Sequence, residues 1–447
     1  MLRALTHIMT NVCERVPIPK NGVDYRGKIV LAPMVRSGEL PSRLLALKYG
    51  ADLVWGPETI DKALIGTTRR INTVTNTVDF TRFSSNGAKN PDVNPDQRES
   101  IIYRLHPSRE GRQLIYQIGT SNPDTAVEAA KLIAGDVAGI DVNAGCPKPF
   151  STSGGMGAAL LKTPDLLCDI LRALVSEVGN PFEIGISVKI RLLETPEQTE
   201  TLVRKLCATG ITGLTVHCRT TPMRPRERAI RQQLPLVRRL CHEAGIACLM
   251  NGDVTSRDEA LQLMKEYGVD GAMIATAAET NSSCFRANDD GGMAPWTEVV
   301  AEYVKMALEV ENRYGNTKYL LGQMIPGKSP VYRQMTQCKS YSELVKALGY
   351  GDELSHLAQE VDQKLDIGTS RKTTKAERKM QEKASKKAQV NGAFSRKRQI
   401  EATATHQAQP QAIKRKADAA ELDEMPADIA RETGPGTLSE QASVLAV

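Results

Sequence analysis

The sequence lacks the cysteine spacings of metal sites. Nine cysteines are scattered over 447 residues without a CxxC pair, and His217 with Cys218 has no second pair at the spacing of a zinc site. No apolar signal stretch is present, and no apolar run approaches the length of a membrane span. An odd number of scattered thiols is typical of a reducing compartment. We therefore expect a cytoplasmic or nuclear protein with no structural metal site and no membrane segment.

Acidic residues are also missing from the start of the chain, where Glu14 is the first. An acid-poor, arginine-containing N-terminus can indicate a mitochondrial presequence. Arg3 and Arg15 are the only arginines or lysines in MLRALTHIMTNVCERVP, so the signal is weak. A mitochondrial location is less favoured than the cytoplasm or nucleus.

Aromatic and β-branched residues are scarce in residues 371–416, which hold 14 Lys plus Arg against three Glu. Residues 417–447 instead hold one Arg against seven acids, which leaves a net charge of +1 for the first 370 residues. We expect the body to fold normally and residues 366–447 to be a disordered tail, basic and then acidic. The basic part either attracts nucleic-acid phosphates or is a solvated linker. RKR and KRK within it resemble a split nuclear-import signal, although such clusters are frequent by chance.

Eight short apolar runs, each closing on polar residues or glycine, are present with room for a helix between most of them. Five expected helices end at a glycine suited to a left-handed cap, in KYGADLV, IAGDVAGIDV, ATGITGLTV, EAGIACLM and EYGVDGAMI. Eight such units predict an α/β protein with a (β/α)8 TIM barrel over residues 28–290, after an extension of residues 1–27. An open doubly wound sheet is the alternative, but no GxGxxG follows the first strand. The runs are KIVLAP, DLVWG, QLIYQI, AGIDVN, ISVKIR, GLTVHC, IACLMNG and GAMIAT.

The most informative segment is DVNAGCPKPFSTSGGMGAALL at residues 141–161. An apolar strand runs into Asn143 and Cys146 and then into a glycine-rich loop, which puts an amide and a thiol where α/β folds bind ligands. A lone cysteine is most often a small core residue. Cys146 lies between Gly145 and Pro147, beyond the strand, where a core side chain has little reason to be. We therefore interpret Cys146 as a catalytic residue.

In a TIM barrel the carboxyl ends of all strands meet at one face. Each polar residue there has an alternative role when taken alone: Lys189 could pair with an acid, and His217 could be a satisfied core histidine. Residues 251–253 and 275–276 follow the seventh and eighth strands, where barrels commonly bind phosphate on backbone N–H groups. Together they predict a site for a polar ring system with a phosphate. The residues expected at this face are Pro33, Met34, Gln117, Asn143, Cys146, Lys189, Arg191, His217, Arg219, Asn251, Gly252 and Thr276.

The segments APMV, YQIGT, DVNAGCPKPFSTSGGMGAALL, VKIR, VHCR, NGD and NTKYLL occur in the order found in tRNA-dihydrouridine synthases. The chain most closely resembles the eukaryotic branch of this family, which modifies the D-loop uridine at position 20. The resemblance covers roughly residues 28 to 340, and its most specific part is the segment that contains Cys146.

The resemblance implies a flavoenzyme in which NADPH, or NADH, reduces FMN, and the reduced flavin reduces the uracil C5=C6 bond. Flavin N5 would pass hydride to C6 while Cys146 protonates C5 from the other face. Lys189 would stabilise the anionic reduced flavin. Asn143 and Arg219 are candidates for orienting the uracil or a nearby phosphate. The other implied cofactor residues are Pro33, Met34, Val35, Gln117 and His217 at the ring, and Asn251, Gly252, Asp253, Ala275 and Thr276 at the phosphate.

Two departures from the family pattern concern this site. Family members usually have an Arg where this chain has Thr276, and a Gly where it has Cys218. Backbone N–H groups and the Thr276 hydroxyl can still donate to a phosphate, so the FMN prediction stands. An acid is common at the end of the second strand, where Pro57 aligns and Glu58 follows. We assign neither of them to the site.

Residues 291–365 have helical spacing and predict a small helical domain, which in this family helps to grip tRNA and is otherwise a packing appendage. The polar segment 71–112 predicts a mobile loop over or beside the mouth. No dinucleotide fold for NADPH and no protein partner is evident. Two other functions stay open: a flavin barrel acting on a small molecule, and a non-catalytic tRNA-binding protein.

Overall fold

The computed structural model describes residues 15–83, 99–224 and 226–367. All of these residues belong to the first of the two units into which the chain divides, residues 1–371. The predicted tail, with its basic clusters and acidic end, lies outside the described residues apart from its first two positions. The first 14 residues of the predicted N-terminal extension also lie outside them.

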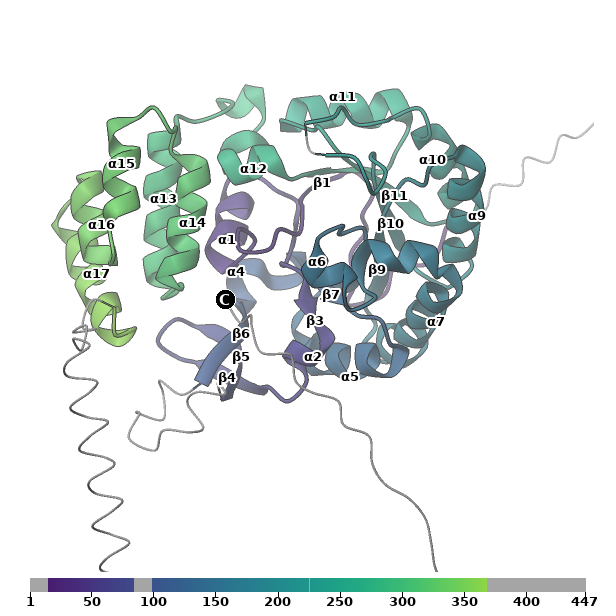
Figure 1. The fold of residues 1–447 in the computed structure, drawn as a ribbon, viewed down its shortest axis with the longest axis horizontal. Helices are drawn as coiled ribbons and strands as arrows, with labels where there is room; N and C mark the ends of the chain where they lie inside the picture. The colour runs from purple at the N-terminus through teal and green to yellow at the C-terminus, as the bar shows by residue number, and fades with distance from the viewer. Residues whose placement is uncertain (1–14, 84–98, 225, 368–447) are drawn as a thin grey trace, which may run out of the picture. The chain divides into compact units, whose positions relative to one another are not determined.

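Eight parallel strands close into a barrel, which confirms the predicted fold class (Figure 1). The order is β2-β1-β12-β11-β10-β9-β8-β7, and β2 also pairs with β7, which closes the ring. A short strand, β3 (Thr59–Ile60), adds to β7. The barrel strands match the eight apolar runs of the sequence: β1 (Lys28–Leu31), β2 (Leu53–Trp55), β7 (Leu114–Gly119), β8 (Gly139–Ala144), β9 (Gly185–Arg191), β10 (Gly213–His217), β11 (Ala247–Asn251) and β12 (Gly271–Ile274).

Helices surround the barrel, and their buried faces share one hydrophobic core with the outward-facing strand residues (Figure 1). Four of the five glycines predicted to end helices have positive φ: Gly50, Gly210, Gly245 and Gly268. The prediction was wrong for Gly135, which lies inside a 3-10 turn (Ala134–Asp136) without positive φ. The helices up to β12 are α1 (Leu40–Lys48), α2 (Asp61–Leu64), α4 (Pro107–Glu110), α5 (Pro123–Ile133), α6 (Pro149–Thr152), α7 (Pro164–Leu174), α8 (Asn180–Phe182), α9 (Pro196–Cys207), α10 (Leu234–Glu243) and α11 (Arg257–Tyr267), and α12 (Thr276–Thr280) follows.

The strand register places predicted site residues next to one another. Asn143 of β8 pairs with Lys189 of β9. His217 of β10 pairs with Arg191 on one side and with Asn251 on the other. Because parallel strands end at the same face, these polar side chains gather at the mouth of the barrel.

The prediction of a mobile loop at residues 71–112 was wrong for the described part of that segment. Strands β4 (Thr68–Asn72), β5 (Thr77–Phe83) and β6 (Glu99–Leu105) form an antiparallel sheet between β2 and β7 in sequence. Val78 and Phe80 of β5 alternate with polar residues and pack against the core. β4 is largely exposed, and β5 buries the polar residues Thr77, Asp79 and Thr81 together with Val78 and Phe80. These strands therefore contain no apolar run, and their polarity led to the wrong prediction.

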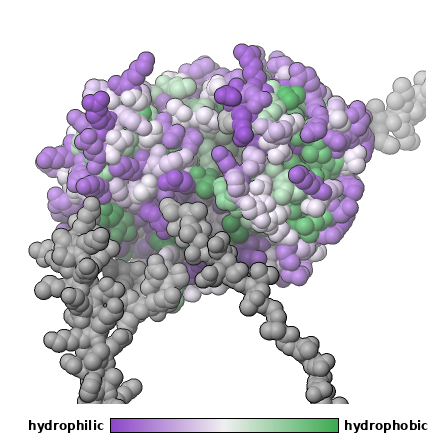
Figure 2. Space-filling view, in the orientation of Figure 1, coloured by the Kyte–Doolittle hydropathy of each residue, from purple (hydrophilic) through white to green (hydrophobic). Residues whose placement is uncertain are grey.

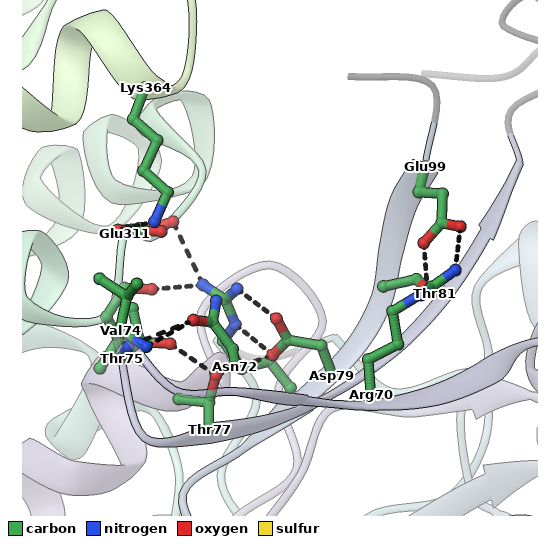
Figure 3. A network of polar contacts seen from close by, with 12 residues as sticks. Arg70, Asn72, Val74, Thr75, Thr77, Asp79, Thr81, Glu99, Glu311 and Lys364 are labelled. Atoms are coloured by element: carbon green, nitrogen blue, oxygen red, sulfur yellow. Dashed lines mark hydrogen bonds and ion pairs between the residues drawn. The ribbon is translucent and has the colours of Figure 1, made fainter. Parts of the chain in front are cut away.

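Arg104 of β6 connects this sheet to the loop after helix α13 (Trp296–Glu309). Figure 3 shows the surrounding polar network, in which Asp79, Glu311 and Lys364 are labelled. The Arg104 guanidinium donates to the carboxylate of Asp79 at 2.6 and 2.5 Å. It also donates to the main-chain oxygens of Val310 and, at 3.4 Å, Glu311. Lys364 pairs with the Glu311 carboxylate at 2.5 Å. The inserted sheet and the C-terminal helices therefore share one polar network.

In the described part of the chain, five helices follow residue 290, as the helical spacing predicted. In Figure 1 they lie together, and α13 packs against α1 and α14 against α12. The Arg36 guanidinium, in the loop after β1, lies 4.2 Å from the centre of the Tyr319 ring. Asn316 donates to the carboxylate of Glu39 in the same loop. The helices thus contact a loop of the barrel mouth. After α13 they are α14 (Tyr314–Met324), α15 (Pro330–Gln337), α16 (Tyr341–Leu348) and α17 (Asp352–Lys364).

The surface in Figure 2 carries mainly hydrophilic side chains, with smaller hydrophobic areas between them. Within the described ranges, no helix combines the length and the apolar character needed to cross a bilayer.

Candidate active site

Cys146 lies in a short loop after β8 that hydrogen bonds hold on several sides. The Asn143 side-chain oxygen accepts from the backbone N–H groups of Gly145 at 3.0 Å and Cys146 at 3.1 Å. Arg191 Nε donates to the Gly145 carbonyl at 2.7 Å. The Cys146 carbonyl accepts from the Ala158 N–H at 2.9 Å. The thiol is therefore fixed at the carboxyl end of the strand, as the sequence predicted.

The Cys146 thiol is half-buried. Burial raises the pKa of Cys146 above that of a free cysteine, and the nearby Glu58 charge raises it further. Because the pKa is raised, the sulfur carries its proton at neutral pH. The group is therefore suited to donate a proton and poorly suited to attack as a thiolate.

Glu58 is the residue that sequence reasoning left out of the site. It follows β2, and its carboxylate accepts a hydrogen bond from Ser151 at 3.0 Å. Its second oxygen is buried and has no partner among the described residues. Burial raises the pKa of Glu58. The only signal for Glu58 in the sequence was an acid at the end of a barrel strand, one position after the expected place.

A buried carboxylate orients Gln117. Asp141 accepts from the Gln117 side-chain amide at 2.8 Å and from the Ser187 hydroxyl at 2.8 Å. Burial raises the pKa of Asp141 to about 6 despite these two hydrogen bonds. Since the amide nitrogen of Gln117 is bound to Asp141, its carbonyl oxygen is the group left to accept from a ligand.

Lys189 and Asn251 form a second pair across the mouth. Lys189 Nζ donates to the side-chain oxygen of Asn251 at 3.1 Å, and the Asn251 amide donates to the Met273 carbonyl at 2.9 Å. Burial, with Arg191 adding to it, lowers the pKa of Lys189 to about 8. Lys189 is therefore mostly protonated at neutral pH and presents a positive charge.

His217 and Arg219 contact each other. Arg219 Nη1 lies 3.1 Å from His217 Nε2. An arginine only donates, so Nε2 must be the unprotonated nitrogen and Nδ1 carries the hydrogen. Burial and then the charge of Lys189 lower the pKa of His217 to about 2. The imidazole is therefore neutral and offers one N–H donor.

The predicted phosphate residues stand in two loops. The turn after β11 has positive φ at Gly252 and Asp253, and a side chain at Gly252 would crowd Ala229 and His217. The Asp253 carboxylate is bound to Arg219 and so is not itself a free acceptor. Ala275 is half-buried and Thr276 exposed after β12.

The loop after β1 holds the remaining predicted residues. Pro33 and Met34 are half-buried, and Val35 is exposed. The Met34 carbonyl accepts from the Gly38 N–H at 2.7 Å, which closes a tight turn. Cys218, the other departure from the family pattern, is fully buried in the core and does not line the mouth.

Comparisons with known proteins agree with the resemblance seen in the sequence. Residues 30–376 match the family described as dihydrouridine synthase (Dus). The tRNA-dihydrouridine(20) synthase (NAD(P)+) of Schizosaccharomyces pombe is 50% identical over 73% of this chain and 65% of its own length. The protein of the same name from Saccharomyces cerevisiae is 45% identical over 72% of this chain and 83% of its own. A human tRNA-dihydrouridine(20a/20b) synthase-like protein is 26% identical over 69% of this chain and 85% of its own. The chain belongs to the dihydrouridine synthase family.

Proposed function

We propose that this protein is an FMN-dependent tRNA-dihydrouridine synthase that uses NADPH or NADH to reduce the C5=C6 bond of a D-loop uridine, at position 20. The observation that carries the proposal is the protonated, half-buried thiol of Cys146 beside the Lys189 and His217 pairs at the barrel mouth. The choice of position 20 rests on the two yeast relatives, which are named for it and are far more similar than the human relative named for 20a/20b.

The residues at the mouth fit FMN. The N–H groups of Asp253 and Val254 make no hydrogen bond within the described part of the chain, so they are available to a phosphate. Lys189 offers a cation and Gln117 an acceptor for the ring, and Ala275 and Thr276 border the phosphate end. When bound, FMN supplies the hydride that reduces uracil C6.

The protein's own part in the reaction is proton delivery and orientation. Cys146 donates the proton to C5, because its raised pKa keeps it protonated until the neighbouring carbon becomes basic. Asn143 holds the loop of Cys146 through its oxygen. Its amide nitrogen, which also acts on the Glu58 carboxylate, is proposed to contact the uracil. Arg219 is proposed to bind the uracil or a phosphate next to it.

Substrate binding is proposed to extend beyond the barrel. A uridine within folded tRNA must be splayed out to reach the mouth, which requires a larger gripping surface than a small molecule does. The helices after the barrel contact the β1 loop through Arg36 and Asn316, so a tRNA held by them would lie next to the site. The basic tail would add salt-dependent attraction to phosphates.

The direct test is the dihydrouridine content of unmodified tRNA after incubation with purified protein, FMN and NADPH. Cys146→Ala is expected to retain flavin and to lose product formation by about 100-fold or more. Cys207→Ala is the matched control, because Cys207 is a free, half-buried thiol on α9, away from the mouth. A normal rate in Cys146→Ala would remove Cys146 from the mechanism.

The wild-type protein separates the alternative functions. A yellow wild-type protein that oxidises NADPH without forming dihydrouridine would favour a small-molecule substrate. A colourless protein that binds tRNA would favour the non-catalytic binding role.

A further inference from the structure

The turn after β11 presents all its oxygens to one neighbour, the loop that follows β10. Arg231 Nη2 donates to the main-chain oxygens of Gly252 at 3.1 Å and Asp253 at 2.8 Å. The Asp253 carboxylate accepts from Arg219 at 2.5 Å and from the Ala229 N–H at 2.7 Å. Two carbonyls and a carboxylate are thus engaged by one loop.

The turn's N–H groups must consequently face elsewhere. In a trans peptide unit the C=O and the N–H point in opposite directions. Since Arg231 holds the carbonyls of Gly252 and Asp253, the N–H groups of Asp253 and Val254 point away from the loop after β10. Neither N–H is used in a hydrogen bond among the described residues.

This arrangement needs support from outside the turn. The φ angles of Gly252 and Asp253 are +119° and +52°. The second is a conformation that a residue with a side chain rarely adopts, at a cost on the order of 1 kcal/mol. Contacts with the turn must therefore select it over the alternatives, and Arg231 supplies two of them from a single nitrogen.

We propose that Arg231 is a positioning residue for the FMN phosphate: it fixes two carbonyls so that the N–H groups of Asp253 and Val254 are held ready to donate to the phosphate. Adjacent backbone N–H groups aimed at one point form a concave anion site. Arg231 does not touch the phosphate in this assignment. The inference rests on the proposed FMN function and adds a residue that the sequence motifs did not indicate.

The experiment compares the binding of FMN and riboflavin to the flavin-free full-length protein by quenching of flavin fluorescence. Riboflavin has the ring system without the phosphate, so it reports on the rest of the site. Arg231→Ala is expected to weaken FMN binding about tenfold and to leave riboflavin binding unchanged. Arg231→Met, which keeps the length of the side chain without its donors, is expected to behave in the same way. Arg228→Ala is the matched control, because Arg228 is an exposed arginine of the same loop.

Three outcomes would overturn the proposal. FMN binding in both Arg231 variants equal to that of wild type would show that Arg231 does not prepare the turn. Equal loss of FMN and riboflavin, together with a lowered melting temperature of the flavin-free protein, would show a purely structural role. A wild-type protein that binds neither flavin would overturn the proposed function as well, whereas normal wild-type FMN binding separates the two claims.

Discussion

The Ser151 hydroxyl donates to the Glu58 carboxylate at 3.0 Å, next to the Cys146 thiol. The two groups act on that thiol with opposite sign: the Glu58 charge raises the pKa of Cys146, and the Ser151 hydroxyl lowers it. They join the loop after β2 to the glycine-rich loop after β8. The acidity of the proposed proton donor is therefore set by residues from two separate strand ends.

Glu58→Gln is expected to lower the pKa of Cys146, because the substitution removes a negative charge that opposes the thiolate. Ser151→Ala is expected to raise it, because the Ser151 hydroxyl lowers the pKa of Cys146. The pH dependence of Cys146 alkylation, followed by mass spectrometry of the peptide, measures both. Shifts in the same direction for the two variants would contradict this account.

Asn143→Ala removes the acceptor of two backbone N–H groups in the Cys146 loop. We expect the free energy of unfolding to fall by about 1–3 kcal/mol and product formation to fall with FMN affinity unchanged. Asn122→Ala is the matched control, because Asn122 accepts from the Thr125 N–H at 3.0 Å at the start of α5. Asn122→Ala should lower the free energy of unfolding by about 1 kcal/mol without affecting product formation. A full rate in Asn143→Ala would show that the loop does not need this anchor.

FMN affinity should depend on the protonation of Lys189. Its pKa of about 8 is below that of a free lysine, so the positive charge is present below pH 8 and is lost as the pH rises through that value. The ammonium form is the stronger hydrogen-bond donor to the flavin ring, so FMN binding should weaken above about pH 8. Lys189→Met should bind FMN more weakly at pH 7 and show a flatter pH profile in a fluorescence titration. Lys131→Met, on the exposed surface of α5, should keep the wild-type profile, and an unchanged profile in Lys189→Met would contradict the assignment.

The barrel could be predicted from the sequence because its strands are buried on both faces and appear as continuous apolar runs. The sheet β4-β5-β6 could not, because β4 is exposed and the buried polar side chains of β5 are satisfied by residues distant in sequence. Arg104, for example, is bonded to Asp79 and to the carbonyl of Val310. No local pattern shows that such a partner exists.

The residues of the candidate site also differ in whether the sequence could predict them. Cys146 follows β8, and Lys189 and His217 lie near the carboxyl ends of β9 and β10, all in recognisable motifs, so their place at the mouth follows from the fold. Arg231 and Glu58 stand in loops whose course depends on tertiary contacts, and strand periodicity carries no information about them. The roles proposed for all five residues stay predictions until they are measured.

Breaking the Arg104–Asp79 pair is expected to destabilise the protein strongly because both side chains are nearly buried, with exposed fractions of 10% and 7%. Arg104→Ala leaves the Asp79 charge and the Val310 carbonyl without this partner, so the free energy of unfolding should fall by about 3 kcal/mol. Denaturant unfolding of the full-length protein measures this loss. Hydrogen exchange should rise in β5 and at the end of α13, because Arg104 bonds both Asp79 and the Val310 carbonyl. Arg172→Ala is the control, since its pair with Asp169 is 57% and 61% exposed and should contribute less than about 1 kcal/mol. Equal effects of the two substitutions would mean that the buried network does not hold the inserted sheet to the C-terminal helices.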